Sequence, residues 1–135
     1  MSTVITSTRF PATRSRRSGP DDRLQVSITA PGDAVTLCAA AGEVDFYTAD
    51  VLRTPLIGAL NTAAPIVAVD LSKVTFFGIA GLHILIEARA WVGHTGRRLR
   101  LVAGPRCVDR LLEAAGDVAA FERVPDLAAA VLDPA

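Results

Sequence analysis

Apolar and polar residues alternate where the regular patterning of the chain begins. Leu24, Val26 and Ile28 are each followed by a polar residue, as in a strand that is buried on one face. The turn-forming sequence Pro-Gly-Asp at 31–33 separates this segment from a second predicted strand at 35–41. Two strands joined by such a short turn pair antiparallel, so the pattern predicts a β-hairpin at the start of the folded region.

Helical signals follow the hairpin, but the first predicted helix contains a proline. Thr48 can cap a helix that begins at Ala49. Pro55 would fall in the second turn of that helix, where the missing N–H group and a steric clash cost about 3 kcal/mol. The sequence therefore predicts that the helix restarts, with Thr54 as a second cap and Pro55 at the first helical position.

Strands and helices alternate over the rest of the chain. A nearly continuous apolar run at 66–70 is typical of a central parallel strand. The remaining elements are predicted as a loop through Ser72 and Thr75, helices at 79–92, 105–115 and 125–132, and strands at 98–103 and 121–124. This alternation predicts an α/β fold with a mixed, mostly parallel sheet, in which only the N-terminal hairpin is antiparallel.

The chain divides into a short arm and one domain. Residues 1–22 are rich in Ser, Thr, Arg, Pro and Gly without periodic apolar positions, which predicts a flexible basic arm. Half of the 135 residues are apolar, so the remaining segment, 23–135, can bury a core without disulfides or a structural metal. We therefore expect a single domain at 23–135.

Charge and hydropathy argue against several classes of function. The chain carries 14 basic and 14 acidic residues, and the arginines of the arm leave the domain slightly acidic. This balance, together with only 5% aromatic residues, argues against direct nucleic-acid binding. A membrane span needs about 20 apolar residues and a secretory signal needs an apolar segment near the N-terminus. Neither pattern occurs, so the sequence predicts a cytoplasmic protein without a membrane segment.

Few residues in the sequence offer catalytic or metal-binding chemistry. His83 and His94 stand eleven positions apart, and neither belongs to a known metal-binding motif with a cysteine or carboxylate. No glycine-rich phosphate-binding loop occurs, and no pairing of a nucleophile with a base is visible. We therefore expect no metal, no cofactor and no enzymatic activity.

The two cysteines differ in their predicted surroundings. Cys38 lies within a predicted strand and is expected to be an inert core thiol. Cys107 lies in the first turn of a predicted helix beside Arg106, where the helix dipole can lower the pKa of a thiol. A redox pair between the two cysteines, and with it a redox-regulated protein, stays open as an alternative.

Three segments, in this order, resemble the STAS domain of bacterial anti-sigma factor antagonists. The first is Gly-Glu-Val-Asp-Phe-Tyr-Thr-Ala at 42–49, and the second runs from Val-Asp-Leu to Ala-Gly-Leu at 69–82. The third is Leu-Val-Ala-Gly-Pro at 101–105, followed by apolar residues at helical spacing. The match to the family covers about residues 24–132, so the resemblance implies a STAS-like fold for nearly the whole domain.

The chain departs from this family at the position of its phosphorylation switch. Regulated members carry a serine or threonine just before the Gly-Leu pair and an aspartate two residues earlier, where this chain has Ala80 and Gly78. A phosphate at a helix start would be held by the backbone N–H groups and would place nearly two negative charges on a docking surface. Ala80 has no hydroxyl to accept it. Ser72 and Thr75 are alternative acceptors, or simply solvated hydroxyl groups.

The resemblance implies an anti-sigma factor antagonist, which binds an anti-sigma factor of the serine-kinase type and so releases a sigma factor. The implied partner-binding residues are Asp45, Phe46, Tyr47, Thr48, Phe77, Gly78, Ile79, Ala80, Gly81 and Leu82. Asp45 is either a polar contact or a solvated residue at a strand end, and the aromatic residues are either exposed anchors or core. We expect a monomer or weak dimer. A STAS scaffold or stressosome-like component, and the STAS subunit of a lipid-transporting ABC system, stay open as alternatives.

Overall fold

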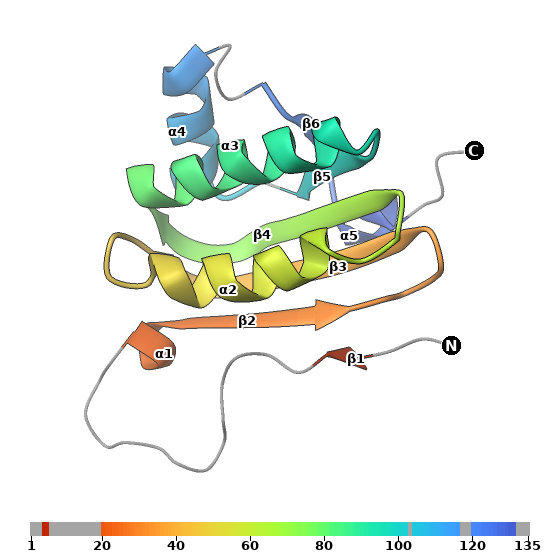
Figure 1. The fold of residues 1–135 in the computed structure, drawn as a ribbon. Helices are drawn as coiled ribbons and strands as arrows, with labels where there is room; N and C mark the ends of the chain where they lie inside the picture. The colour runs from red at the N-terminus through yellow and green to blue at the C-terminus, as the bar shows by residue number, and fades with distance from the viewer. Residues whose placement is uncertain (1–3, 6–19, 103, 117–119, 132–135) are drawn as a thin grey trace.

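A single mixed sheet organises the chain. The computed structural model describes residues 4–5, 20–102, 104–116 and 120–131. The elements are β1 (Val4–Ile5), α1 (Pro20–Arg23), β2 (Leu24–Thr29), β3 (Val35–Val44), α2 (Ala49–Leu60), β4 (Ile66–Phe77), α3 (Ile79–His94), β5 (Arg98–Val102), α4 (Arg106–Ala115), β6 (Glu122–Val124) and α5 (Leu127–Ala130). The six strands lie in the order β1-β2-β3-β4-β5-β6 (Figure 1). Among the described residues, no helix is long and apolar enough to cross a bilayer.

The strand directions confirm the predicted fold class. β2 pairs antiparallel with β3, as the hairpin pattern predicted, and β1 adds a short antiparallel pair at the outer edge of β2. The pairs β3–β4, β4–β5 and β5–β6 are all parallel. Since α2, α3 and α4 connect the successive parallel strands, the chain is an α/β domain of alternating strands and helices.

The sheet buries its two faces unequally. α2 and α3 lie side by side across one face, and α5 lies behind the sheet (Figure 1). The larger core fills the space between the sheet and the helix pair, and the alternating residues Leu24, Val26 and Ile28 all belong to it. A smaller cluster on the opposite face includes Ile66 and Ala130. The alternation in β2 is therefore explained by the helix layer on one of its sides.

The prediction of a loop through Ser72 and Thr75 is wrong, because both residues lie within the twelve-residue strand β4. β3 is also longer than predicted and continues to Val44. The two strands pair over nearly their whole length, with register shifts near Ala41 and Glu43. Ser72 and Thr75 are polar because they lie on exposed positions of the strand, and this polarity suggested a loop. Pairing with β3 keeps the segment extended.

The prediction that the first helix restarts at Pro55 is also wrong. α2 runs without interruption from Ala49 to Leu60, with Pro55 buried inside it. The missing N–H group costs one helical hydrogen bond. Leu52 and Leu56 are almost fully buried against the sheet, and this burial offsets the loss.

The predicted arm at 1–22 falls mostly outside the described residues, which begin at 4–5 and resume at Pro20. Where it is described, the chain is ordered into two small elements. Val4 and Ile5 pair with Thr29 and Ile28 as β1. α1 then leads directly into β2.

Candidate functional site

The segments that resemble the STAS motifs meet at one end of the sheet. β3 and β4 are parallel, so their carboxyl ends lie at the same edge, where α2 and α3 begin (the left side of Figure 1). The backbone N–H of Gly78 donates to the carbonyl of Val44 at 2.9 Å. This bond joins the end of β3 to the start of α3.

A compact hydrogen-bonded turn connects β3 to α2. One oxygen of Asp45, Oδ1, accepts hydrogen bonds from the backbone N–H groups of Tyr47 at 2.8 Å and Thr48 at 2.9 Å. The hydroxyl of Thr48 donates to the carbonyl of Glu43 at 2.7 Å and accepts from the N–H of Asp45 at 2.9 Å. Thr48 is the N-cap residue of α2, as predicted, but its fully buried side chain ties the turn together and makes no cap bond.

Arg23 completes the turn from the opposite side of the hairpin. Its Nη1 donates to Oδ2 of Asp45 at 2.9 Å and to Oε1 of Glu43 at 3.1 Å. Burial works to raise the pKa of Asp45, but the hydrogen bonds from Arg23 and from the N–H groups of Thr48 and Tyr47 outweigh it and lower the pKa below its usual range. The hydrogen bond with Asp45 likewise raises the pKa of Arg23. Asp45 is therefore ionised at neutral pH, and both of its oxygens hold the turn.

Large apolar side chains stand exposed around this turn and the start of α3. Phe46 is 80% exposed and Tyr47 is 72% exposed, and their rings meet edge to face with centroids 5.5 Å apart. Phe76, at the end of β4, and Ile79, at the start of α3, are each half-exposed or more. We call Phe46, Tyr47, Phe76 and Ile79 the docking patch, because isolated large apolar groups are ordinary on a surface but a cluster of four is typical of an interaction site.

A shallow hollow of about 460 Å³ lies within the docking patch. Its lining consists of Asp45, Phe46, Phe76, Gly78, Ile79, Ala80 and His83. Ala80 is partly exposed in the first turn of α3. Among the described residues, no side chain caps the start of α3 and none in its first turn is acidic. The hollow therefore faces the positive end of the α3 dipole without a compensating negative group from the helix itself.

The predicted partner-binding residues divide by burial. Thr48, Phe77, Gly81 and Leu82 are buried, so they support the surface from beneath. The exposed or partly exposed ones are Asp45, Phe46, Tyr47, Gly78, Ile79 and Ala80. Their role in binding a partner stays a prediction.

Sequence reasoning missed two residues that line the hollow, Phe76 and His83. Both positions were available from periodicity. Side chains alternate along a strand, so a buried Phe77 places Phe76 on the opposite side. His83 follows Ile79 by one helical turn and so shares its face.

Ser72 and Thr75 lie away from the hollow, since neither is among its described lining residues. Both are exposed on β4. The N–H of Ser72 donates to Oδ1 of the buried Asp70 at 2.9 Å. Phosphorylation of Ser72 or Thr75 stays a prediction without a contact that favours it.

Both cysteines are free thiols in the described part of the chain. Cys38 is fully buried in β3, and desolvation raises the pKa of its thiol to about 12. Cys107 is partly buried in α4, with its Sγ 3.8 Å from the carbonyl of Val74. The structure thus holds no bond between the two cysteines predicted as an alternative redox pair. Nor do three metal-ligating side chains come together anywhere in the described chain.

We expect a thiol reagent such as dithionitrobenzoate to detect one cysteine in the folded protein at pH 8 and two after unfolding. The thiolate is the reactive form, and a pKa of about 12 leaves roughly one Cys38 in ten thousand ionised at that pH. Cys107 is reached by solvent and should react. The control is Cys107→Ser, which should remove the native signal. Rapid reaction of two thiols in the folded protein would contradict this difference in environment.

The comparisons with known proteins bear on this end of the sheet. A family model described as "Mlab, STAS domain" matches residues 26–117. The chain belongs to the STAS domain family. The match includes β3, β4 and α3, and therefore the whole docking patch of this STAS domain.

Solved structures agree with this membership. An anti-sigma factor antagonist from Mycobacterium paratuberculosis is 27% identical, with a TM-score of 0.73, over 85% of this chain and 96% of that one. The unphosphorylated antagonist SpoIIAA is 12% identical, with a TM-score of 0.64, over 77% of this chain and 91% of that one. Protein TM1081 is 14% identical, with a TM-score of 0.63, over 93% and 94%. The last two likenesses support the STAS fold alone. No curated protein matches the chain.

Proposed function

We propose that this STAS domain protein is an anti-sigma factor antagonist, which binds an anti-sigma factor of the serine-kinase type through the docking patch and so releases a sigma factor. The observation that carries the proposal is the cluster of Phe46, Tyr47, Phe76 and Ile79, left exposed around the start of α3. The likeness to the antagonist from Mycobacterium paratuberculosis supports it, since that likeness extends over 96% of the other chain.

The chemistry of the docking patch favours binding over catalysis. Aromatic side chains are enriched among the residues that dominate interface energies, and Phe46 and Tyr47 are free to enter a partner's pocket. Of the described groups that line the hollow, Asp45 and His83 alone could transfer a proton. The oxygens of Asp45 are engaged by Arg23 and the turn. The protein therefore acts by competition between partners.

Ala80 makes this antagonist permanently competent to bind. A phosphate at this position would face the N–H groups at the start of α3 and would bring about two negative charges into the docking patch. Ala80 offers no hydroxyl, and Gly78 replaces the aspartate of the family pattern. The partner kinase can bind the patch but cannot switch it off at residue 80.

The other parts of the proposal follow from this role. The protein works in the cytoplasm, where sigma factors act, as a monomer or weak dimer, and it contacts neither nucleic acid nor membrane directly. Thr48, Phe77, Gly81 and Leu82 hold the patch in shape from below, because all four are buried. Asp45 contributes by shaping the turn that presents Phe46 and Tyr47.

A binding screen tests the proposed function. The purified protein is immobilised and offered each anti-sigma factor of the source organism in turn. We expect one factor of the serine-kinase type to bind and to lose its sigma factor, measured by displacement of a fluorescently labelled sigma factor. Incubation with that factor and ATP should leave the protein without phosphate in the mass spectrum, at Ser72 and Thr75 as well as at residue 80.

Three outcomes would contradict the proposal in different ways. Binding to no anti-sigma factor, with recovery of the protein in a large assembly from cell extract, would support the scaffold alternative. Recovery with an ABC-type ATPase would support the transporter subunit. Phosphate at Ser72 or Thr75 with loss of binding would leave the partner correct but would overturn permanent competence.

A further inference from the structure

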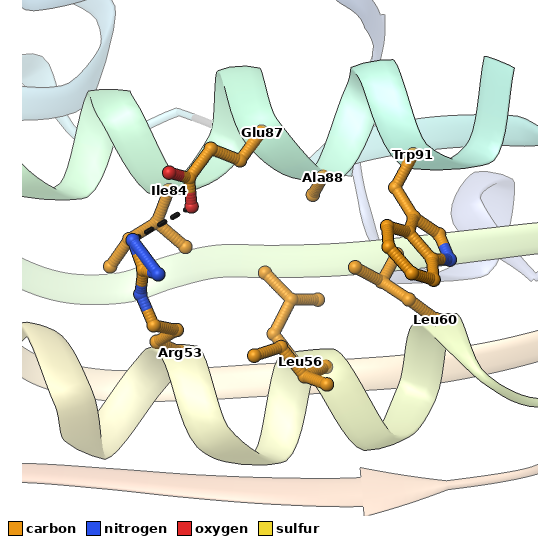
Figure 2. A pocket seen from close by; sticks show the side chains of 8 residues that line it. Arg53, Leu56, Leu60, Ile84, Glu87, Ala88 and Trp91 are labelled. Carbon is orange, nitrogen blue, oxygen red and sulfur yellow. Dashed lines mark ion pairs between the residues drawn. The ribbon is translucent and has the colours of Figure 1, made fainter. Parts of the chain in front are cut away.

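A second apolar surface lies between α2 and α3 (Figure 2). It is a groove of about 340 Å³, and its described lining residues are Arg53, Leu56, Ile57, Leu60, Ile84, Glu87, Ala88 and Trp91. Figure 2 shows Arg53 reaching across from α2 toward Glu87 on α3, with the indole of Trp91 near Leu60 at the other end. The groove is therefore bounded by an ion pair at one end and by an aromatic ring at the other.

The groove leaves large apolar side chains in water. Ile57 is 48% exposed and Trp91 is 51% exposed, although both belong to helices whose inner sides are fully buried. Trp91 is the single tryptophan of the chain. Exposed apolar surface of this kind contributes nothing to folding and is typical of a binding groove.

The groove continues the docking patch along α3. Ile79, Ala80 and His83 line the hollow of the patch, and Ile84 and Glu87 line the groove immediately after them on the same helix. α2 and α3 run in the same direction, so both begin at the docking patch (Figure 1). A partner bound to the docking patch is therefore adjacent to the groove and can contact both surfaces.

The charges of the groove define what can fill it. Of its described lining residues only Arg53 and Glu87 are charged, and they neutralise each other through an ion pair of 2.8 Å between Nη2 and Oε1. A charge on the occupant would lose water without gaining a partner, which is unfavourable. The occupant therefore presents an uncharged apolar face between the ion pair and Trp91.

The shape of the groove selects a helix. A valley between two neighbouring helices accepts the apolar face of a third helix and offers no strand edge for pairing. From Ile84 to Trp91, the part of α3 that lines the groove, the helix advances about 10.5 Å, because each residue adds about 1.5 Å. A helix of about two turns, with apolar residues at i, i+3 or i+4, and i+7, spans this distance.

We propose that an amphipathic helix of the anti-sigma factor occupies the α2–α3 groove, as a second contact beside the docking patch. This inference rests on the proposed function, since it concerns the same partner. It adds that the antagonist recognises two parts of the anti-sigma factor, and that Trp91 and Ile57 contribute to the affinity.

The test compares charged variants on the two surfaces with a matched control. Trp91→Glu places a carboxylate in the groove, whereas Ala90→Glu places the same charge at the adjacent exposed position of α3 outside the groove. We expect Trp91→Glu to weaken binding of the purified anti-sigma factor by about tenfold or more and Ala90→Glu by less than about twofold. Ile79→Glu, in the docking patch, should abolish binding. Circular dichroism verifies that each variant folds. If Trp91→Glu does not fold, Ile57→Glu takes its place in the groove, with Thr54→Glu as its control outside the groove.

A label at the single tryptophan reports the contact without any mutation. Protein that carries 5-fluorotryptophan gives one fluorine resonance from residue 91. Addition of the unlabelled anti-sigma factor should shift this resonance and abolish its sensitivity to exchange of H₂O for D₂O, because the indole leaves solvent. In the protein alone the resonance should not change with concentration.

The possible results separate this proposal from the proposed function. If Ile79→Glu abolishes binding while Trp91→Glu matches Ala90→Glu and the fluorine resonance stays solvent-sensitive, the groove proposal is overturned and the function stands. If the anti-sigma factor binds all variants equally, both the docking patch and the groove are wrong. A resonance that shifts with the concentration of the protein alone would assign the groove to a second copy of the chain and would also overturn the proposal.

Discussion

Replacement of Gly81 by alanine is expected to destabilise the protein by about 1–3 kcal/mol, the usual effect of overpacking a core. A Cβ atom at this position would lie 2.6 Å from Cε1 of Phe77 and 2.8 Å from Cγ1 of Val44. Both neighbours are buried, so neither can move away freely. The start of α3 must therefore shift outward, and with it Ile79 in the docking patch.

A second glycine in the same helix provides the control for this prediction. At Gly93 no described atom lies within 4 Å of the added Cβ, apart from its chain neighbours and the backbone of its own helix, so Gly93→Ala should stabilise the helix by about 0.5–1 kcal/mol. Urea denaturation of the two variants should thus move the midpoints in opposite directions. A Gly81→Ala variant as stable as Gly93→Ala would show that α3 does not pack tightly against the ends of β3 and β4.

Ala80→Asp is expected to weaken binding of the anti-sigma factor by roughly 2 kcal/mol or more, which is about thirtyfold. The carboxylate would stand in the hollow of the docking patch and would be desolvated there without a partner. Folding should not suffer, because an acidic residue in the first turn of a helix is favourable by about 0.3–1 kcal/mol. In the wild type no described residue in the first turn of α3 is acidic, so this favourable interaction with the helix dipole is not yet made.

Ala80→Asn is the matched control, because it has the same shape without the charge. Isothermal titration calorimetry with the purified anti-sigma factor should give a smaller loss for the asparagine variant than for the aspartate variant. The melting temperature of Ala80→Asp should equal or exceed that of the wild type. Unchanged affinity in a folded Ala80→Asp variant would place the partner elsewhere and would remove the basis for permanent competence.

The sequence alone was sufficient to predict the fold class and the order of the strands and helices from β2 onward. Alternation at Leu24, Val26 and Ile28 reports burial against one helix layer, because strand side chains alternate between the two faces of a sheet. The apolar run at 66–69 reports a central strand, which is covered on both faces. These patterns depend on neighbours in sequence, and local physics is enough to interpret them.

Contacts between segments distant in sequence decided where two elements extend. β4 continues through Ser72 and Thr75 because β3 lies beside it, and a strand partner at a distance in sequence leaves no local signal. Pro55 stays inside α2 because the helix buries Leu52 and Leu56 against the sheet. In both cases tertiary contacts outweigh a local preference of a few kcal/mol.

The candidate site shows the same division. The motif at 42–49 indicated Asp45 as a partner-binding residue. Its structural role depends on Arg23, whose Nη1 the hairpin brings within 2.9 Å of Oδ2 of Asp45. Likewise, the sequence places apolar residues on every side of α3, and only the packed structure shows that Leu85 is buried while Trp91 faces the groove. Sequence determines which side chains are apolar, whereas exposure depends on which surfaces the rest of the chain covers.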